Sequence, residues 1–267
     1  MPETERRPVL PKMIGEKIIT HASDDYPRRK WIIREKLSEN QFPLTEEDVK
    51  QEMGPAFTVG KYLCEGDGAK DKLAFLRLFK QIPWEGTELD DSRTRAKQAV
   101  DQQPGHVELA ALKYLTENGC SATPKLLGYE FDQQDKNDLV PGGYILYLVW
   151  GKVKGDPLDF QEFWRLPYKE RENIREKFRE AYTEVLTFGY EPMMPSTSKI
   201  ILDKATGDVK ISGFKKAEYI GQSGNWNDRN FLRFRLALKS VDRCKDIPDV
   251  AEDLDTHQMA GYGKKGA

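Results

Sequence analysis

Short blocks of apolar residues separated by polar turns run through the first 150 residues, and they predict strands. Residues 57–63 and 73–79, "FTVGKYL" and "LAFLRLF", flank the turn "EGDGAKD", a pattern typical of a β-hairpin. Residues 123–131 and 142–150, "TPKLLGYEF" and "GGYILYLVW", predict two further strands. This half of the chain is therefore expected to be rich in β-sheet.

Leucines at a spacing of three predict a helix between these two pairs of strands. Leu109, Leu112 and Leu115 would share one face of a helix over residues 106–119, and Gly119 would end it. This helix would separate the hairpin from the next two strands.

The second half of the chain shows mainly helical spacing. A short helix is predicted over residues 159–166 and the longest one over about 168–188, with Gly189 ending it. In the long helix, alternating Glu and Arg are expected to cover the face opposite an apolar stripe formed by Ile174, Phe178, Ala181 and Val185. A final amphipathic helix is predicted over 226–241, with Phe231, Phe234 and Leu238 inward.

The N-terminal 55 residues are charged and interrupted by proline. Residues 29–40, "RKWIIREKLSEN", suggest a helix with an apolar face, and residues 43–53 suggest a second helix with Thr45 as its N-cap. We therefore expect an N-terminal helical extension over 1–55, either packed on the main domain or forming a mobile arm.

A Pro-bounded loop and a small hairpin follow the long helix. The loop is "PMMPSTS", residues 192–198, and "KIIL" and "VKIS" flank the turn "DKATGD" at residues 203–208. The whole chain then reads as a β-rich region over 56–153 followed by a helical region over 154–267. The segment "GKVKGDPLD" between them has the composition of a hinge.

Composition narrows the classes of function. The 267 residues are 38% hydrophobic and 32% charged, and the net charge is −2 with both signs intermixed. Such a chain lacks the basic surface of a nucleic-acid binder and a polybasic membrane arm. The three cysteines and three histidines are scattered, which argues against a zinc site. No stretch is apolar enough to span a membrane.

The cysteine count also bears on location. An odd, low number of cysteines suits a reducing compartment, and the N-terminal "MPETERRPVLPKMIGEK" lacks the apolar core of a signal peptide. We therefore expect an intracellular, cytoplasmic protein.

Three segments together resemble a known fold. They are "ELAALKYLTENGCSATPKLLGYE", "VPGGYILYLVWGKVKG" and "EPMMPSTSKIILDKATGDVKISGF". In this order the chain resembles the protein-kinase-like fold, and more closely a fungal branch of small kinase-like proteins, over about residues 57–219. The resemblance implies an α+β fold with two lobes, a small β-rich N-lobe and a reduced helical C-lobe.

The resemblance also assigns positions, and most of the catalytic ones have changed. The family's catalytic Asp falls on Met194, its metal-binding Asn on Lys199 and its DFG-type Asp on Gly213, which Phe214 follows. The residue expected to grip phosphate, a Lys in the family, is Arg77, and the helix Glu that pairs with it is Glu108. The turn "EGDGAKD" does not match the family's G-x-G-x-x-G loop.

These substitutions remove the chemistry of phosphotransfer. A kinase uses one Asp to orient the attacking hydroxyl, and an Asp and an Asn to hold Mg²⁺. Mg²⁺ requires oxygen ligands, which Met194, Lys199 and Gly213 do not offer. Asp203 and Asp208 lie nearby, but both suit hydrogen bonds within the turn. We therefore expect no phosphotransferase activity, no metal and no cofactor.

Each remaining candidate residue has a structural and a functional interpretation. Arg77 and Glu108 could form an ion pair between strand and helix, or Arg77 could contact a ligand. Lys199 could be a solvated surface residue, or a charge that binds an anionic ligand without metal. Met193 and Met194 could fill the core or line an apolar pocket, and Trp150 could be a core aromatic or a pocket wall.

Three classes of function stay open at this stage. The first is a cleft that binds an apolar small molecule and promotes a cyclisation, a pericyclic step or an isomerisation in fungal secondary-metabolite biosynthesis, mainly by holding a reactive shape. The second is a pseudokinase scaffold or allosteric regulator that binds a protein partner. The third is residual phosphotransfer on a small molecule. The candidate pocket consists of Arg77, Glu108, Trp150, Met194, Lys199 and Phe214.

Overall fold

The computed structural model describes residues 7–21, 26–67, 73–100, 105–221 and 224–238. The chain packs into two units, each formed from two stretches of sequence. The first unit holds residues 1–106 and 126–152, and the second holds 107–125 and 153–267. The division therefore groups the segment 107–125 with the later part of the chain. The domain boundaries predicted from the sequence, at residue 56 and between residues 153 and 154, stay a prediction.

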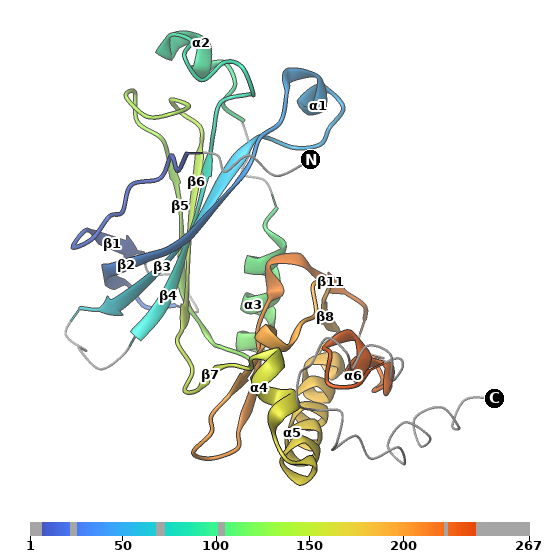
Figure 1. Ribbon diagram of the computed structural model, residues 1–267. Coiled ribbons are helices and arrows are strands. Elements are labelled where there is room, and N and C mark those ends of the chain that lie inside the picture. The colour runs from blue at the N-terminus through green and yellow to red at the C-terminus, as the bar shows by residue number, and fades with distance from the viewer. Residues whose placement is uncertain (1–6, 22–25, 68–72, 101–104, 222–223, 239–267) are drawn as a thin grey trace. The chain divides into compact units, whose positions relative to one another are not determined.

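The first unit is built on a six-stranded antiparallel sheet with two short helices beside it (Figure 1). The strands lie in the order β1-β2-β3-β4-β6-β5. Their bounds are Lys17–Thr20 (β1), Arg29–Phe42 (β2), Phe57–Gly66 (β3), Leu73–Gln81 (β4), Leu126–Gln133 (β5) and Tyr144–Gly151 (β6), and the helices are Glu46–Lys50 (α1) and Ser92–Ala96 (α2). The hairpin and the two later strands predicted from the sequence are confirmed.

Residues 29–40, predicted as a helix, form most of strand β2 instead. Trp31 and Ile33 are buried and alternate with residues that are less buried, which is the period of a strand. Bulges between Ile33 and Glu35, and between Lys36 and Ser38, break that alternation, so the sequence pattern resembles a helix. The helix expected at Thr45 is correct, because the Thr45 hydroxyl and the Asp48 carboxylate form a capping box at α1.

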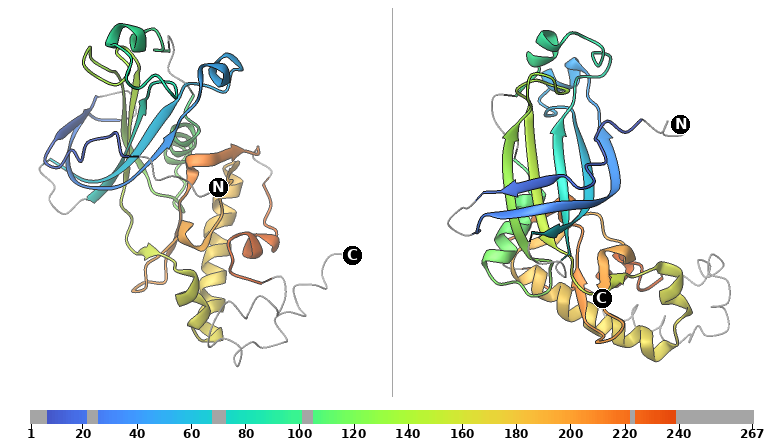
Figure 2. Two further views of the ribbon diagram at one scale, coloured as in Figure 1. Left: turned by 45° about the horizontal axis from the view of Figure 1, so that its top comes forward. Right: turned by 90° about the vertical axis from the view of Figure 1, so that its left-hand side faces the viewer.

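The six-stranded sheet curls until its two edge strands meet. The backbone N–H of His21, directly after β1, donates to the carboxylate of Glu130 on β5 over 2.8 Å. A Cβ built on Gly128 of β5 would lie 2.7 Å from Oγ1 of Thr20, so only glycine allows this approach. Figure 2 shows β1 and the start of β2 lying across the other strands. The curling therefore brings the outer edges of β1 and β5 against each other, which shields them from pairing with another chain.

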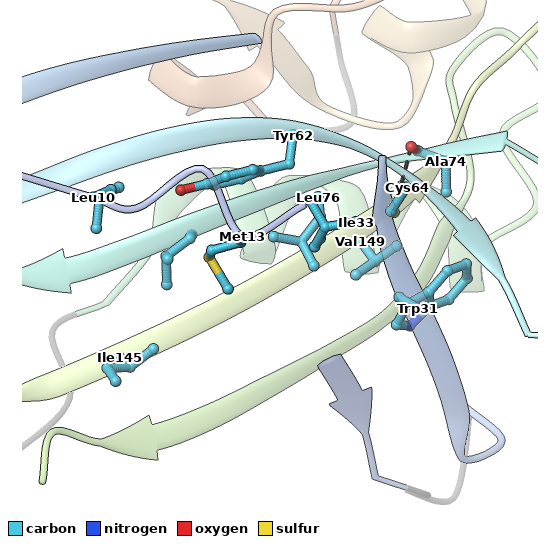
Figure 3. Packing of buried hydrophobic residues seen from close by; sticks show 11 residues of the cluster. Leu10, Met13, Trp31, Ile33, Tyr62, Cys64, Ala74, Leu76, Ile145 and Val149 are labelled. Carbon is cyan, nitrogen blue, oxygen red and sulfur yellow. Dashed lines mark hydrogen bonds between the residues drawn. The ribbon is translucent and has the colours of Figure 1, made fainter. Parts of the chain in front are cut away.

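Apolar side chains fill the concave face of this sheet (Figure 3). Leu10 and Met13, from the segment before β1, are both buried and join a cluster with Trp31, Ile33, Tyr62, Cys64, Ala74, Leu76, Leu78, Ile145 and Val149. The N-terminal segment is thus part of the core of the first unit, and its β1 and β2 belong to the main sheet.

The second unit is mainly helical, and its described residues also form two small sheets. Its helices are Val107–Glu117 (α3), Phe160–Arg165 (α4), Tyr168–Thr187 (α5) and Arg229–Arg233 (α6). One sheet joins β10 (Val209–Ile211), β9 (Ile200–Leu202) and β7 (Asp156–Pro157), and a ribbon joins β11 (Ala217–Tyr219) to β8 (Tyr190–Pro192). Single turns of 3-10 helix, η1 (Thr197–Lys199) and η2 (Phe214–Lys216), precede β9 and β11.

The predictions for the second half are confirmed with two corrections. The apolar stripe of α5 is buried as expected, but Arg171 and Arg175 are buried on that face too, because their guanidinium groups lie over Trp164 at 5.1 and 5.8 Å from the ring centroid. The final helix is shorter than expected, since α6 ends at Arg233. Residues 239–241 of that prediction lie outside the described residues.

Candidate functional site

The loop that follows β8 is fixed at both ends by backbone hydrogen bonds. At its start, the N–H of Met193 donates to the carbonyl of Lys216 over 2.7 Å. At its end, the carbonyl of Lys199 accepts from both the N–H and the hydroxyl of Ser212, at 2.8 and 3.1 Å. The loop therefore has a defined conformation although its residues make no regular ladder.

Lys199 and Gly213 stand at the two positions where the resemblance places the family's metal ligands, and they lie against each other. Gly213 has a φ of +97°, and a Cβ built on it would lie 2.9 Å from Cδ and 3.0 Å from Cγ of Lys199. The aliphatic part of the lysine thus occupies the place where a side chain at position 213 would begin. Among the described residues, no carboxylate pairs with the Lys199 ammonium.

Met194, at the position of the catalytic Asp, is 54% exposed, and its neighbour Met193 is 46% exposed. The interpretation of these methionines as core filler is therefore wrong. Both are held on the surface by a loop whose first N–H is already bonded to η2. A thioether there offers a soft, apolar contact in place of a proton acceptor.

Phe214 and Glu108 are buried in the second unit. Phe214 opens η2 and is 2% exposed, and Glu108 lies in the first turn of α3 and is 5% exposed. Helix α3 packs against η2 and β11. Phe214 is therefore a core residue that lies beside the loop.

Arg77 and Trp150 come together on one face of the sheet in the first unit. They lie on the neighbouring strands β4 and β6, and the guanidinium carbon of Arg77 is 5.1 Å from the centroid of the Trp150 ring. Lys61 of β3 is directly opposite Arg77 in the register, and its ammonium lies 3.9 Å from the ring centroid of Phe75. We call Lys61, Phe75, Arg77 and Trp150 the cation–aromatic face.

Lys61 and Phe75 were not among the predicted site residues. Their position follows from the pairing register of β3 with β4, which places Lys61 across from Arg77. The apolar run of β4 was visible in the sequence, but its pairing register with β3 was not. Trp150 is 8% exposed, so its ring is largely covered, and it lies tilted against Phe75 with the ring centroids 6.0 Å apart.

The six candidate residues are thus divided between the two units. Arg77 and Trp150 belong to the cation–aromatic face of the first unit, and the other four belong to the second. Within the described residues, no three His, Cys, Asp or Glu side chains are grouped so that they could hold a metal ion. No helix in the described part of the chain is both long and apolar enough to cross a membrane.

Comparison with known proteins finds similarity at the level of structure and not of sequence. No family model and no curated protein matches the sequence. The structure is similar to that of the Cydia pomonella granulovirus kinase PK-1, with 14% sequence identity and a TM-score of 0.42. The similarity covers 72% of this chain and 53% of that one, so the chain spans about half the length of the viral kinase.

Proposed function

We propose that this chain is a kinase-fold protein that does not transfer phosphate and that binds an apolar small molecule instead. The order of elements supports the fold: strands, one helix, two strands, helices, a loop and a hairpin follow one another as the sequence resemblance implies. The changed residues Met194, Lys199 and Gly213 support the loss of phosphotransfer.

One observation carries the proposal: the stem of Lys199 fills the side-chain position of Gly213. A carboxylate at that position would hold Mg²⁺ in a kinase. Here the nearest side chain ends in an ammonium, which repels a divalent cation and has no lone pair to give it. The pair Lys199–Gly213 has therefore replaced two oxygen ligands by one positive charge.

The groups that remain suit binding and positioning. The cation–aromatic face places two cations beside the half-buried ring of Phe75 and the largely covered ring of Trp150, and the loop presents Met193 and Met194 to solvent. Flat aromatic surfaces and methionines bind uncharged organic molecules, while a cation can polarise a carbonyl group. Holding a flexible molecule in a reactive shape can lower a barrier by about 7–11 kcal/mol in favourable cases. Binding a flexible molecule and holding it in a reactive shape is most of what a cyclase, pericyclase or isomerase of fungal secondary metabolism requires of its protein.

The test is a thermal-shift titration with ATP, with and without Mg²⁺, beside fractions of small molecules from the producing cell. A ligand at 100 times its dissociation constant stabilises the fold by about 2.7 kcal/mol, which raises Tm visibly. We expect no Mg²⁺-dependent shift with ATP and a clear shift with one fraction. Sustained Mg²⁺-dependent ATP turnover would overturn the proposal.

A substitution tests whether the ligand binds at the cation–aromatic face and not elsewhere on the protein. Trp150→Leu is expected to abolish the shift given by the active fraction, because it removes the flat ring that Arg77 and Phe75 contact. Trp84→Leu is the matched control, since Trp84 is a half-buried tryptophan of the same unit outside that face. Equal loss in both variants would show that the shift does not report on the face.

A pseudokinase scaffold that binds a protein partner is the second candidate, and one feature of the second unit favours it. Tyr114, Tyr190 and Tyr219 contact one another, with ring centroids 5.3 to 6.3 Å apart. Tyr219 is 56% exposed and the next residue, Ile220, is 36% exposed. Clustered, exposed tyrosines are typical of protein interfaces. A partner that co-purifies with the wild-type chain and is lost with Tyr219→Ala would support this role, and a clean monomer would count against it.

A further inference from the structure

Residues 7–13 lie across strands β2 and β3 as a peptide lies in a binding groove. The carboxylate of Glu39 accepts from the backbone N–H groups of Val9 and Leu10 at 2.9 to 3.3 Å. The ammonium of Lys36 donates to the carbonyl of Leu10 over 2.6 Å. Side chains of β2 therefore bind the backbone of this segment, although no strand ladder forms there.

Two further side chains complete the groove. The hydroxyl of Tyr62 donates to the carbonyl of Pro11 over 3.0 Å, and the amide of Gln41 donates to the carbonyl of Arg7 over 2.7 Å. Each of these bonds joins a side chain of the sheet to the main chain of the segment. Such bonds require a backbone in the right conformation but do not require that it belong to the same molecule.

Apolar anchors fix the position of the segment. Leu10 is 4% exposed and Met13 is 7% exposed, and both enter the cluster on the concave face of the sheet (Figure 3). A Cβ built on Gly60 of β3 would lie 2.8 Å from Cδ1 of Leu10, so the groove is shaped around this side chain. Buried anchors with backbone hydrogen bonds between them are how grooves recognise peptides.

The turn that joins this segment to β1 holds unfavourable backbone conformations. Met13 has a φ of +56°, which is rare outside glycine, and Gly15 has a φ of +82°. The N–H of Glu16 donates to the carbonyl of Met13 over 2.9 Å, which closes the turn. Short, strained turns of this kind favour exchange of the segments that they connect.

We propose that residues 7–13 exchange between two copies of this chain. In the exchanged dimer the segment of each copy fills the groove of its partner, so Glu39, Lys36, Tyr62 and the anchors keep identical contacts. The turn at Met13–Gly15 opens in both copies. Each dimer therefore relieves the unfavourable positive φ angles of two turns. Within one copy the segment has an effective concentration of about 1 mM, so the wild-type chain is expected to dimerise only at high protein concentration.

The test is Gly15→Ala in the full chain, measured by sedimentation over a range of concentrations. A Cβ at Gly15 meets no atom within 4 Å, so the substitution penalises only the positive φ of the closed turn. With a penalty of roughly tenfold for each turn, the dimer dissociation constant should fall by up to about 100-fold. Gly207→Ala is the matched control, because Gly207 has a φ of +77° and equally open space but lies in the β9–β10 turn.

Cross-linking of Gly15→Ala identifies the interface. Arg7→Cys and Gln41→Cys are added, because the Gln41 amide contacts the carbonyl of Arg7 in the groove. In an exchanged dimer a short thiol cross-linker joins the two copies, so a covalent dimer should appear on a denaturing gel, and Gly15→Ala without the two added cysteines is the control. A Gly15→Ala dimer whose chains are linked only internally, or not linked above the control, would place the interface elsewhere and overturn the proposal. So would a Gly15→Ala chain that stays as monomeric as the wild type, or a Gly207→Ala chain that dimerises to the same degree.

Discussion

The stem of Lys199 lies directly beside Gly213, so a change at one of these residues affects the other. Both positions can be recognised from the sequence as departures from a kinase, because that comparison needs only the order of the residues. That the lysine stem fills the space beside the glycine could not be predicted, because it depends on the 3-10 turn η2 and on the left-handed conformation of Gly213.

A double-mutant cycle measures this dependence. In the wild-type background, Gly213→Ala is expected to lower the free energy of unfolding by about 2–4 kcal/mol, from both the positive φ and the clash with Lys199. In a Lys199→Ala background the clash is gone, so the cost should fall to about 1–2 kcal/mol. Urea unfolding of the four proteins gives the coupling energy. Equal costs in the two backgrounds would show that the lysine stem moves away freely.

His106 gives the protein an acid-sensitive position. Its ring lies between Phe79 and Tyr144, with centroids 4.7 and 5.6 Å away, and burial lowers the pKa of His106 to about 4. The folded state therefore holds the neutral imidazole, while the unfolded chain takes up a proton below about pH 6.5. The stability that depends on this group is present above pH 6.5 and is lost as the pH falls toward 4.

The substitution His106→Phe should remove this pH dependence. Between pH 7 and pH 5 the wild type is expected to lose about 2 kcal/mol more of its free energy of unfolding than the variant, because Phe cannot take up a proton. Urea unfolding at the two pH values is the measurement. The same loss in both proteins would mean that other groups cause it.

At the scale of elements, strand β2 shows where sequence patterns mislead. The paired strands β3 and β4 were predictable, because apolar runs and a Gly-rich turn are local signals. Strand β2 was not, since its two bulges shift the side-chain alternation and its partners β1 and β3 lie elsewhere in the chain. Tertiary pairing overrides local pattern in such segments.

Helices α4 and α5 hold the segment around α6 through buried donors. Nε of Arg175 donates to the carbonyl of Leu236 over 2.8 Å, and Nε1 of Trp164 donates to the carbonyl of Arg235 over 3.2 Å. These bonds satisfy carbonyl groups just after α6 ends. The long helix α5 thus contributes two charged side chains, Arg171 and Arg175, to the interior. The charge pattern of the helix alone does not distinguish them from its surface residues.

Arg175→Gln is expected to lower the free energy of unfolding by about 2–3 kcal/mol, because it removes a charged hydrogen bond from the interior and the stacking on Phe163. Arg165→Gln is the matched control, since Arg165 is exposed at the end of α4, and it should cost less than about 0.5 kcal/mol. Chemical denaturation measures both. A small effect of Arg175→Gln would show that water replaces the lost bond easily.

At the scale of the molecule, closure of the curled sheet depends on one glycine. Gly128 on β5 meets Thr20 on β1, and Thr20 also accepts a hydrogen bond from the indole of Trp31 over 3.1 Å. A larger residue at position 128 must push the two edge strands apart. Neither the contact nor its importance can be predicted from the sequence, because the two residues are distant in the chain.

Gly128→Ala is therefore expected to lower Tm by several degrees, with a loss of about 1–3 kcal/mol. Gly105→Ala provides the control, because a Cβ at Gly105 meets no atom within 4 Å. Calorimetry of the two variants decides. If Gly128→Ala is as stable as the control, the strands separate at little cost and closure contributes little to stability.

The place of Leu10 and Met13 in the core also sets an order of events during synthesis. These residues leave the ribosome well before Ile145 and Val149, yet they pack with them in one cluster. The concave face of the sheet must stay incomplete until β6 has emerged, and contacts between such distant residues form slowly. Until then the nascent chain exposes apolar surface and unpaired strand edges, the features that chaperones bind. We therefore expect this protein to depend on chaperones from the emergence of Leu10 until β6 has been made.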